Sequence, residues 1–154
     1  MGSEMCIRDS IFTLIDDYGH HPTEIKATIC ACREAFPEQE IRLIFQPHRY
    51  TRTRDLFDDF VSVLSEVDSL ILLDVYEAGE IQVIGADSTT LARSIRLLGK
   101  VNPLVLSLND NPLDAIDSVI ENNEVLLIMG AGSIHQLTGL ILDSFESPVV
   151  REIL

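Results

Sequence analysis

Residues 11–24 read IFTLIDDYGHHPTE, and this stretch decides the fold. An apolar run rich in β-branched residues, 11–15, passes directly into acidic residues and a glycine, and Pro22 follows with Glu24 behind it. A short, nearly continuous apolar run is typical of a strand that is buried on both faces. A proline followed by an acidic residue is typical of the first turn of a helix. The stretch therefore predicts a buried strand that leads through a polar loop into a helix.

The same strand-to-helix unit recurs along the chain. Short apolar runs alternate with segments of helical period, and no internal repeat or low-complexity linker interrupts them. The predicted strands are 11–15, 41–45, 70–73, 104–108 and 125–129, and the predicted helices are 22–36, 53–64, 88–98, 112–120 and 134–145. This alternation predicts an α/β fold, a Rossmann-like three-layer domain with a mostly parallel sheet of about five to six strands.

Charge and composition limit the classes of partner. The chain has 154 residues, of which 46% are hydrophobic, enough for the buried core of one domain. Its 25 acidic and 11 basic side chains give a net charge of −14, and an acidic surface repels nucleic-acid backbones and anionic lipid. No apolar run reaches the roughly 18 residues of a membrane-spanning helix. We therefore predict no nucleic-acid partner and no membrane association.

The cysteines indicate a reducing compartment. Cys6, Cys30 and Cys32 cannot form a closed set of disulfides, and Cys30 and Cys32 point away from each other on a predicted helix. We therefore expect reduced thiols in a cytoplasmic protein.

The first ten residues, MGSEMCIRDS, do not fit the pattern that follows them. They lack the apolar core of a signal peptide, and they mix glycine, serine and charged residues without periodicity. We interpret residues 1–10 as a non-native leader and residues 11–154 as the domain. This interpretation implies that further sequence is missing upstream.

Residues with unusual chemistry follow the predicted strands. The stretches DDYGHHPTE, QPHRYTRTR, DVYEAGE and GAGS begin at Asp16, Gln46, Asp74 and Gly130. Parallel strands bring their carboxyl ends to one edge of the sheet, and ligands of open α/β sheets bind there. The sequence therefore predicts a binding site at this edge. In the last stretch, Gly130 and Gly132 suit either an anion at a helix N-terminus or a tight turn.

Three arginines in the second stretch favour an anionic ligand. Arg49, Arg52 and Arg54 lie within six positions of an otherwise acidic chain. Guanidinium groups bind carboxylates or phosphates through two parallel hydrogen bonds. The alternative is that these arginines pair with nearby carboxylates, which are Asp55, Asp58 and Asp59.

Histidines and aspartates at the same edge leave several roles open. His20, His21 and His48 could hold a proton, orient an amine or bind a metal. The loops lack the further ligands that a zinc site needs, so we predict no metal site. We expect His21, just before a helix, to cap or pack. Asp16 and Asp17 could be an acid–base pair, a cation site or turn formers.

The first two stretches resemble the signature sequences of the UDP-N-acetylmuramate–L-alanine ligases, which belong to the Mur ligase family. They cover residues 16–24 and 46–53, and residues 74–80 and 85–88 follow the same family pattern. The resemblance runs from Ile11 to the end of the chain. It implies a Mur ligase C-terminal domain, with the central ATPase domain and the N-terminal UDP-sugar domain absent.

The resemblance also implies an activity. Enzymes of this family are ATP-dependent, amide-forming ligases of peptidoglycan synthesis, which activate the sugar's lactyl carboxylate as an acyl phosphate that the amino group of alanine attacks. The implied ligands are L-alanine, ATP and UDP-N-acetylmuramate, with ATP and Mg²⁺ held mainly by the missing central domain. In that scheme the C-terminal domain closes over ATP and presents the amino acid. Because the chain contains no Gly-x-x-Gly-Lys-Ser/Thr phosphate loop, we expect it to be inactive alone.

Site residues follow from the same resemblance. The implied L-alanine-binding residues are Tyr18, His20, His48, Arg49 and Arg52. The two arginines would clamp the carboxylate of alanine, and the other three would line the pocket around its amino group and methyl. The candidate catalytic residues are His20 and His48. Asp17 would bind the ribose hydroxyls of ATP.

Three other functions stay open from the sequence alone. A related ligase attaches a whole tripeptide to the same sugar and shares the His-His-Pro-Thr stretch, although Tyr18-Gly19 and the full 46–53 motif favour the alanine enzyme. A phosphoacceptor signalling module would use the aspartates at 16, 17 and 74, but the fifth predicted strand is not followed by its lysine. A free-standing small-molecule binding domain is the third alternative.

Overall fold

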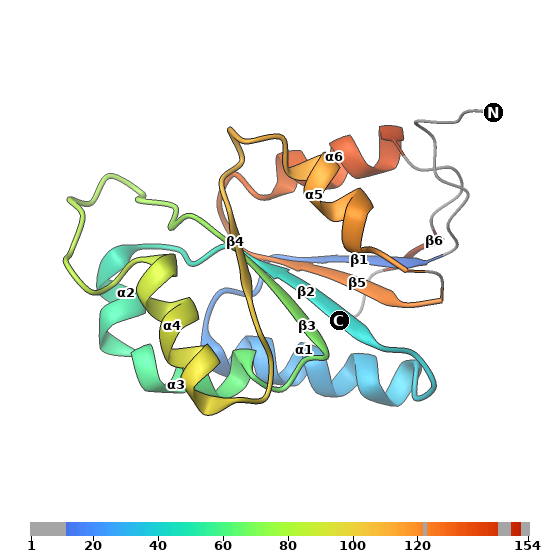
Figure 1. The fold of residues 1–154 in the computed structure, drawn as a ribbon, viewed down its shortest axis with the longest axis horizontal. Helices are drawn as coiled ribbons and strands as arrows, with labels where there is room; N and C mark the ends of the chain where they lie inside the picture. The colour runs from blue at the N-terminus through green and yellow to red at the C-terminus, as the bar shows by residue number, and fades with distance from the viewer. Residues whose placement is uncertain (1–11, 122, 145–148, 152–154) are drawn as a thin grey trace.

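The apolar runs of the sequence form parallel strands of one sheet in a computed structural model, which describes residues 12–121, 123–144 and 149–151 (Figure 1). The strands are β1 Thr13–Asp17, β2 Ile41–Phe45, β3 Ser69–Leu73, β4 Leu104–Leu106, β5 Val125–Met129 and β6 Val149–Arg151. The helices are α1 Pro22–Ala35, α2 Tyr50–Asp55, α3 Phe57–Leu64, α4 Ser88–Leu98, α5 Pro112–Val119 and α6 His135–Ser144. The interpretation of residues 1–10 as a leader lies outside the described residues and stays a prediction.

The strand order in the sheet is β4-β3-β2-β5-β1-β6, and each pairing among the described strands is parallel. β5 lies at the centre, where Leu127 is opposite Ile15 of β1 on one side and Leu43 of β2 on the other. The predicted Rossmann-like α/β domain with a mostly parallel sheet is therefore confirmed.

Helices cover both faces of the sheet, which explains why the strands are apolar along their whole length. Helices α1 to α4 lie on one face and α5 and α6 on the other (Figure 1). In β2, Leu43 and Phe45 pack into the buried cluster under α1, α3 and α4, whereas Ile44 packs into the cluster under α5 and α6. Burial of each such side chain contributes about 1.5–3 kcal/mol to folding.

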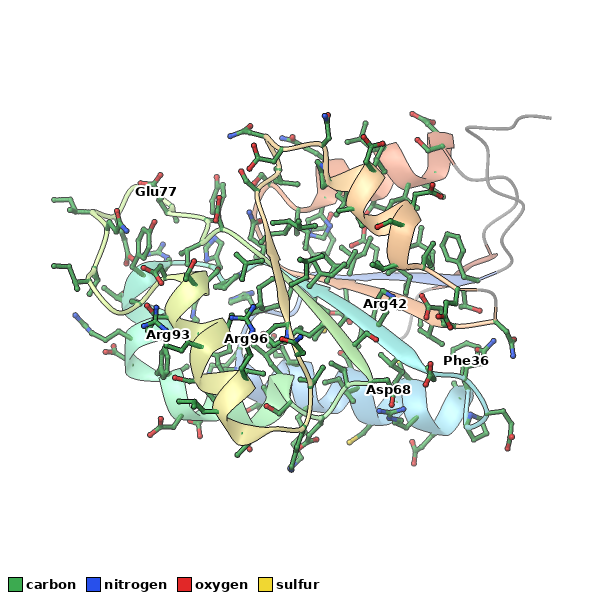
Figure 2. All side chains as sticks on the ribbon, viewed as in Figure 1. Phe36, Arg42, Asp68, Glu77, Arg93 and Arg96 are labelled. Carbon is green, nitrogen blue, oxygen red and sulfur yellow. The ribbon has the colours of Figure 1, made fainter. Side chains whose placement is uncertain are left out.

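The amino-terminal end of the strands carries a buried ion pair. Nε of Arg42 lies 2.9 Å from Oε1 of Glu124, and the two side chains are 13% and 4% exposed. Arg42 also donates to the carbonyl of Val119 at 2.9 Å. Figure 2 shows Arg42 near this end of the sheet and Glu77 at the opposite end, on the loop after β3. The pair ties β2, β5 and the end of α5 together at the end of the molecule remote from the polar loops.

Three predicted strands have different bounds in the structure, and the third, predicted at 70–73, begins one residue earlier, at Ser69. The first was predicted at 11–15, but Asp16 and Asp17 continue its ladder opposite Ile128 and Met129 of β5. Asp17 also forms the turn after the strand, because its carboxylate accepts a hydrogen bond from the N–H of Gly19. Ile11 lies outside the described residues. The fourth was predicted at 104–108 but ends at Leu106, because Ser107 begins a turn.

The predicted helix 53–64 is two helices, α2 and α3, and this prediction was wrong about both its start and its continuity. The helices meet at Leu56, whose φ of −114° and ψ of 24° lie outside the helical range. The stripe of apolar residues belongs to α3. Helix α2 begins earlier, at Tyr50, because a carboxylate from a distant loop accepts hydrogen bonds from its first turn. Phe145, the end predicted for the last helix, lies outside the described residues.

The structure also shows the state of two cysteines and whether any described helix could cross a membrane. Cys30 is exposed and Cys32 is buried on α1, and both are free thiols, as their spacing on the predicted helix indicated. Cys6 lies outside the described residues. Within the part of the chain that the structure describes, no helix has both the length and the apolar character needed to cross a membrane.

Candidate functional site

The carboxyl ends of β2 and β5 border the crevice of the sheet. These strands are neighbours, and their connections lead in opposite directions, to β3 and to β6, which is the point where open α/β sheets bind ligands. The buried side chain of Gln46 spans the crevice. It accepts a hydrogen bond from the backbone N–H of Ile134 at 3.0 Å and donates one to Oγ of Ser133 at 3.1 Å. Gln46 therefore fixes the loop after β5 against the loop after β2.

The glycines of the loop after β5 are explained by close packing. A Cβ atom at Gly130 would lie 2.9 Å from Cγ2 of Ile134 and 3.2 Å from the carbonyl oxygen of Gln46. A Cβ atom at Gly132 would lie 2.5 Å from Cγ of Tyr76. Of the two interpretations made from the sequence, the structure supports the tight turn.

The loops after β2 and β3 are joined by backbone hydrogen bonds. The N–H of Tyr76 donates to the carbonyl of Pro47, and the N–H of Arg49 donates to the carbonyl of Tyr76, both at 2.8 Å. The rings of His48 and Tyr76 stack, with centroids 5.3 Å apart and planes 18° apart. Arg49 has a φ of 76°, a conformation that non-glycine residues rarely adopt and that tends to cluster at functional sites.

Glu80 stabilises the start of α2 beside Arg49. Its carboxylate accepts hydrogen bonds from the hydroxyl of Thr51 at 2.6 Å and from the backbone N–H of Thr51 at 3.1 Å. The Thr51 hydroxyl, and then the backbone amides, lower the pKa of Glu80 below its ordinary value. NH1 of Arg49 lies 3.9 Å from Oε2 of Glu80. The loop after β3 therefore holds in place the loop that carries the arginines.

Three basic side chains gather where the loops after β1 and β2 meet. The rings of His20 and His48 have centroids 5.5 Å apart. NH1 of Arg52 donates to the carbonyl of His48 at 3.0 Å and lies 3.2 Å from its Nδ1. Burial, followed by the charge of Arg52, lowers the pKa of His48. At neutral pH His48 is thus an uncharged ring, and the charges of Arg52 and, to a smaller extent, Arg49 help to keep it so.

A second cluster joins the loop after β1 to the start of α6. The rings of Tyr18 and His135 have centroids 4.1 Å apart. Nε2 of His135 donates to the carbonyl of Gly130 at 2.7 Å, and its Nδ1 lies 2.8 Å from Oδ1 of Asp16. The Nδ1–Oδ1 pair is a close contact whose geometry is not that of a hydrogen bond. Tyr18 is 70% exposed, so this ring is open to a ligand.

Comparison with known proteins shows which protein family has this arrangement of loops and strands. The family model described as "Mur ligase, glutamate ligase domain" matches residues 5–132, well over half of the chain. The chain belongs to this family.

Relatives of the Mur ligase domain are similar in sequence and in fold. A UDP-N-acetylmuramate–L-alanine ligase of Nitrosospira multiformis is 58% identical over 127 residues, which are 82% of this chain and 26% of the relative. The enzyme of the same name from Nitrosomonas eutropha is 54% identical over 126 residues, 82% and 27% of the two chains. The crystal structure of a UDP-N-acetylmuramate–alanine ligase from Thermotoga maritima has a TM-score of 0.64 and 27% identity, and covers 86% of this chain and 26% of that chain. The chain thus spans about a quarter of the length of these relatives.

The Mur ligase domain brings together the five residues predicted to bind alanine. His20, His48 and Arg52 are in contact through their side chains, Arg49 lies next to His48, and Tyr18 lies two residues before His20. The structure thus places Tyr18, His20, His48 and Arg49 in loops at one edge of the sheet and Arg52 in helix α2, which follows one of these loops, as expected from the parallel strands.

Other predicted residues have structural partners. Both carboxylate oxygens of Asp17 accept hydrogen bonds, from the N–H of Gly19 at 2.7 Å and from the hydroxyl of Thr28 at 3.2 Å. His21 accepts a hydrogen bond from the N–H of Thr23 at 3.1 Å and caps α1, so its predicted role is confirmed. The alternative of pairing within the arginine loop applies to Arg54, which pairs with the neighbouring aspartate at 2.9 Å.

Sequence reasoning missed four residues that shape the site. These are Gln46, Tyr76, Glu80 and His135. All four follow strands, but the first three act through hydrogen bonds or packing between loops, which a linear sequence does not display. His135 is the fourth histidine of the chain, and its position after the fifth predicted strand was the available signal.

A cavity of about 700 Å³ lies at this edge of the sheet. It is lined mainly by the loops 74–79 and 107–109, together with Gln46, Ser133 and Gln136. The five predicted alanine-binding residues do not line it. Within the described residues, no group of three or more His, Cys, Asp and Glu side chains is placed to hold a metal ion.

Proposed function

We propose that this chain is the C-terminal domain of an ATP-dependent ligase that joins L-alanine to UDP-N-acetylmuramate in peptidoglycan synthesis, a reaction of the cytoplasm. The observation that supports it best is that the side chains of His20, His48 and Arg52 gather in space, with Arg49 next to His48 in the chain. Such a site offers a cation for a carboxylate and imidazole nitrogens for an amine, the two charged groups of a free amino acid. The names of the relatives support alanine as the amino acid, rather than a tripeptide.

Arg49 is the arginine best suited to bind the carboxylate. Its side chain is 48% exposed, and within the described residues its guanidinium has only the loose 3.9 Å pairing with Glu80. NH1 of Arg52 is committed to His48, which leaves its Nε and second terminal nitrogen for a ligand. Arg49 therefore supplies the main contact with the carboxylate of alanine, and Arg52 adds a second contact while it orients His48. Tyr18, whose exposed ring packs on His135, is the proposed pocket wall contributed by the loop after β1.

The proposed ATP contact is Asp17. Its two oxygens already accept one hydrogen bond each, and each retains a further lone pair that a ribose hydroxyl can use. ATP supplies the phosphoryl group that activates the sugar carboxylate, and Mg²⁺ accompanies it. The acidic residues of this domain form no cluster suited to Mg²⁺ among the described residues, so we assign the metal to the central domain.

Positioning is the contribution of this domain to the reaction. When the amino group is held against an activated carboxyl group, a bimolecular reaction step becomes effectively unimolecular. Such positioning lowers the activation free energy by about 7–11 kcal/mol in favourable cases. Because the chain lacks a Gly-x-x-Gly-Lys-Ser/Thr loop, we expect no conversion of ATP, alanine and UDP-N-acetylmuramate to UDP-N-acetylmuramoyl-alanine by the 154-residue chain alone. Product formation by the purified chain would refute this expectation.

The deciding experiment is Arg49→Ala in a full-length enzyme in which central and UDP-sugar domains precede this chain. Loss of a charge-assisted hydrogen bond should raise the KM for alanine about 10- to 100-fold. The KM for ATP should stay nearly unchanged. Arg54→Ala is the matched control, because Arg54 pairs with its neighbour Asp55 on the same helix. Equal losses for ATP and alanine would show that Arg49 binds phosphate instead. Consumption of the tripeptide in place of alanine would favour the recycling ligase.

A further inference from the structure

The two site histidines are hydrogen-bonded in opposite senses. Nδ1 of His20 lies 3.2 Å from the carbonyl oxygen of Tyr18, and since a carbonyl only accepts, Nδ1 of His20 carries the hydrogen. Nδ1 of His48 lies 3.2 Å from NH1 of Arg52, and since a guanidinium only donates, Nδ1 of His48 carries the lone pair. In their neutral forms, His20 thus has its lone pair on Nε2, whereas His48 has its N–H on Nε2.

The surroundings of His48 keep it neutral. Burial lowers its pKa most, and the charges of Arg52, His20 and Arg49 lower it further, while Glu80 acts in the opposite direction. The Tyr76 ring covers one side of the imidazole. His48 is therefore a fixed hydrogen-bond donor.

The surroundings of His20 differ. Oε1 of Glu24 lies 4.0 Å from Nδ1 of His20, where a carboxylate would face the positive charge of a protonated ring. The same carboxylate accepts hydrogen bonds from the backbone N–H groups of His20 and His21, both at 3.1 Å, so it is held in place by the capping box of α1. His20 is thus the histidine beside which a negative charge is already positioned.

We propose that His20 accepts a proton at Nε2 from the ammonium group of the bound amino acid, whereas His48 donates a hydrogen bond from Nε2 to its carboxylate. This proposal rests on the amino-acid site proposed above. The proton leaves the ammonium nitrogen, His20 becomes an imidazolium that faces Glu24, and the freed lone pair of the amine can form the new C–N bond. The ring centroids are 5.5 Å apart, so one small amino acid can reach both rings. Arg52 is a positioning residue, since it determines which nitrogen of His48 carries the hydrogen.

The tautomers can be measured on this chain without any assumption about its reaction. Two-bond ¹⁵N–¹H correlation spectra of ¹⁵N-labelled protein distinguish the two neutral forms of each imidazole, and His20→Gln and His48→Gln assign the signals. We expect the Nδ1–H form for His20 and the Nε2–H form for His48. Arg52→Gln should convert His48 to a mixture of forms and raise its titration midpoint. Arg54→Gln, on the same helix, should leave both rings unchanged. An Nε2–H form of His20, or a His48 spectrum insensitive to Arg52→Gln, would overturn the assignment.

The proton transfer is tested separately in the full-length enzyme. His20→Gln should lower kcat at saturating alanine about 100-fold or more, as expected for loss of a general base. His48→Gln should act mainly on the KM for alanine. If His20→Gln kept kcat within a few-fold at all pH values while Arg49→Ala still raised the alanine KM, the proton transfer would be refuted and the proposed function would stand. If Arg49→Ala had no effect on the alanine KM, the site itself would be wrong.

Discussion

The ring of Tyr76 fills the space that a side chain at Gly132 would need. A Cβ atom at Gly132 would lie 2.5 Å from Cγ of Tyr76 and 2.8 Å from both its Cβ and Cδ2. The same ring also contacts the site, because it stacks on His48. One glycine after β5 therefore sets the position of an imidazole in the loop after β2, through a tyrosine in the loop after β3.

Gly132→Ala should destabilise the domain by about 1–3 kcal/mol, the usual cost of inserting a methyl group into a close-packed contact. The Cβ atom of Tyr76 cannot move away from Gly132 easily, because the Tyr76 backbone is hydrogen-bonded to Pro47 and Arg49. Urea denaturation measures the change. The control is Gly139→Ala in α6, where an added Cβ meets no atom within 4 Å and alanine should stabilise the helix by up to about 1 kcal/mol. Equal effects at the two glycines would contradict the packing argument.

The ion pair at the other end of the sheet gives a second prediction. Glu124→Ala leaves the guanidinium of Arg42 buried without its carboxylate, which should cost about 3–5 kcal/mol of unfolding free energy. Asp55→Ala breaks the exposed pair with Arg54 and should cost less than about 1 kcal/mol. Urea denaturation monitored by circular dichroism measures both losses of unfolding free energy. A loss below about 1 kcal/mol for Glu124→Ala would show that Arg42 finds water or another acceptor.

The two thiols of α1 should differ in reactivity. Burial, and next the charge of Asp17, raises the pKa of Cys32 to about 11. At pH 8 about one Cys32 side chain in a thousand is then a thiolate, the reactive form. In a Cys6→Ser background, iodoacetamide should modify the exposed Cys30 first, and Cys32 should react at least about 100-fold more slowly. Mass spectrometry of peptides measures both rates, and concentrated urea should equalise them. Similar rates in the native protein would place Cys32 at the surface.

The fold was predictable because a strand buried on both faces can be recognised from a few consecutive residues of the sequence. Strands covered on both faces read as unbroken apolar runs, and Leu43, Ile44 and Phe45 show this by packing alternately into the two clusters. The same rule misled where burial was not the cause of structure. Asp16 and Asp17 belong to β1 through backbone hydrogen bonding with β5, although their side chains are polar. The extra turn of α2 depends on Glu80, which is remote in the sequence.

The candidate site was predictable in its residue types but not in its connections. Parallel strands alone place Tyr18, His20, His48 and Arg49 at one edge. What the sequence cannot give is which partner each side chain takes. Arg52 interacts with His48 rather than standing free, and Asp17 is tied to Gly19 and Thr28. These pairings depend on loop geometry, and they determine the hydrogen-bonding sense of each histidine.

The carboxylate of Glu80 should make the arginine loop sensitive to acid. Its pKa is lowered, chiefly by the hydrogen bond from the Thr51 hydroxyl, so its contribution to stability is present above the ordinary glutamate pKa of about 4.3 and is lost as the pH falls through the lower folded-state value. The amide proton of Thr51 reports this change, because it donates to Oε1 of Glu80 at 3.1 Å. In ¹⁵N–¹H spectra its chemical shift should titrate with a midpoint below 4.3, the ordinary glutamate value.

Glu80→Gln separates this effect from general acid unfolding. The variant keeps a side chain of the same size but removes the titrating group, so the shift of the Thr51 amide should become independent of pH in this range. Arg49 also loses its 3.9 Å partner, and its signals should move together with those of Thr51. Glu38→Gln, at an exposed position in the turn between α1 and β2, should leave the Thr51 titration unchanged. A Thr51 midpoint at or above the ordinary glutamate value in the unmutated protein would mean that Glu80 does not hold the start of α2.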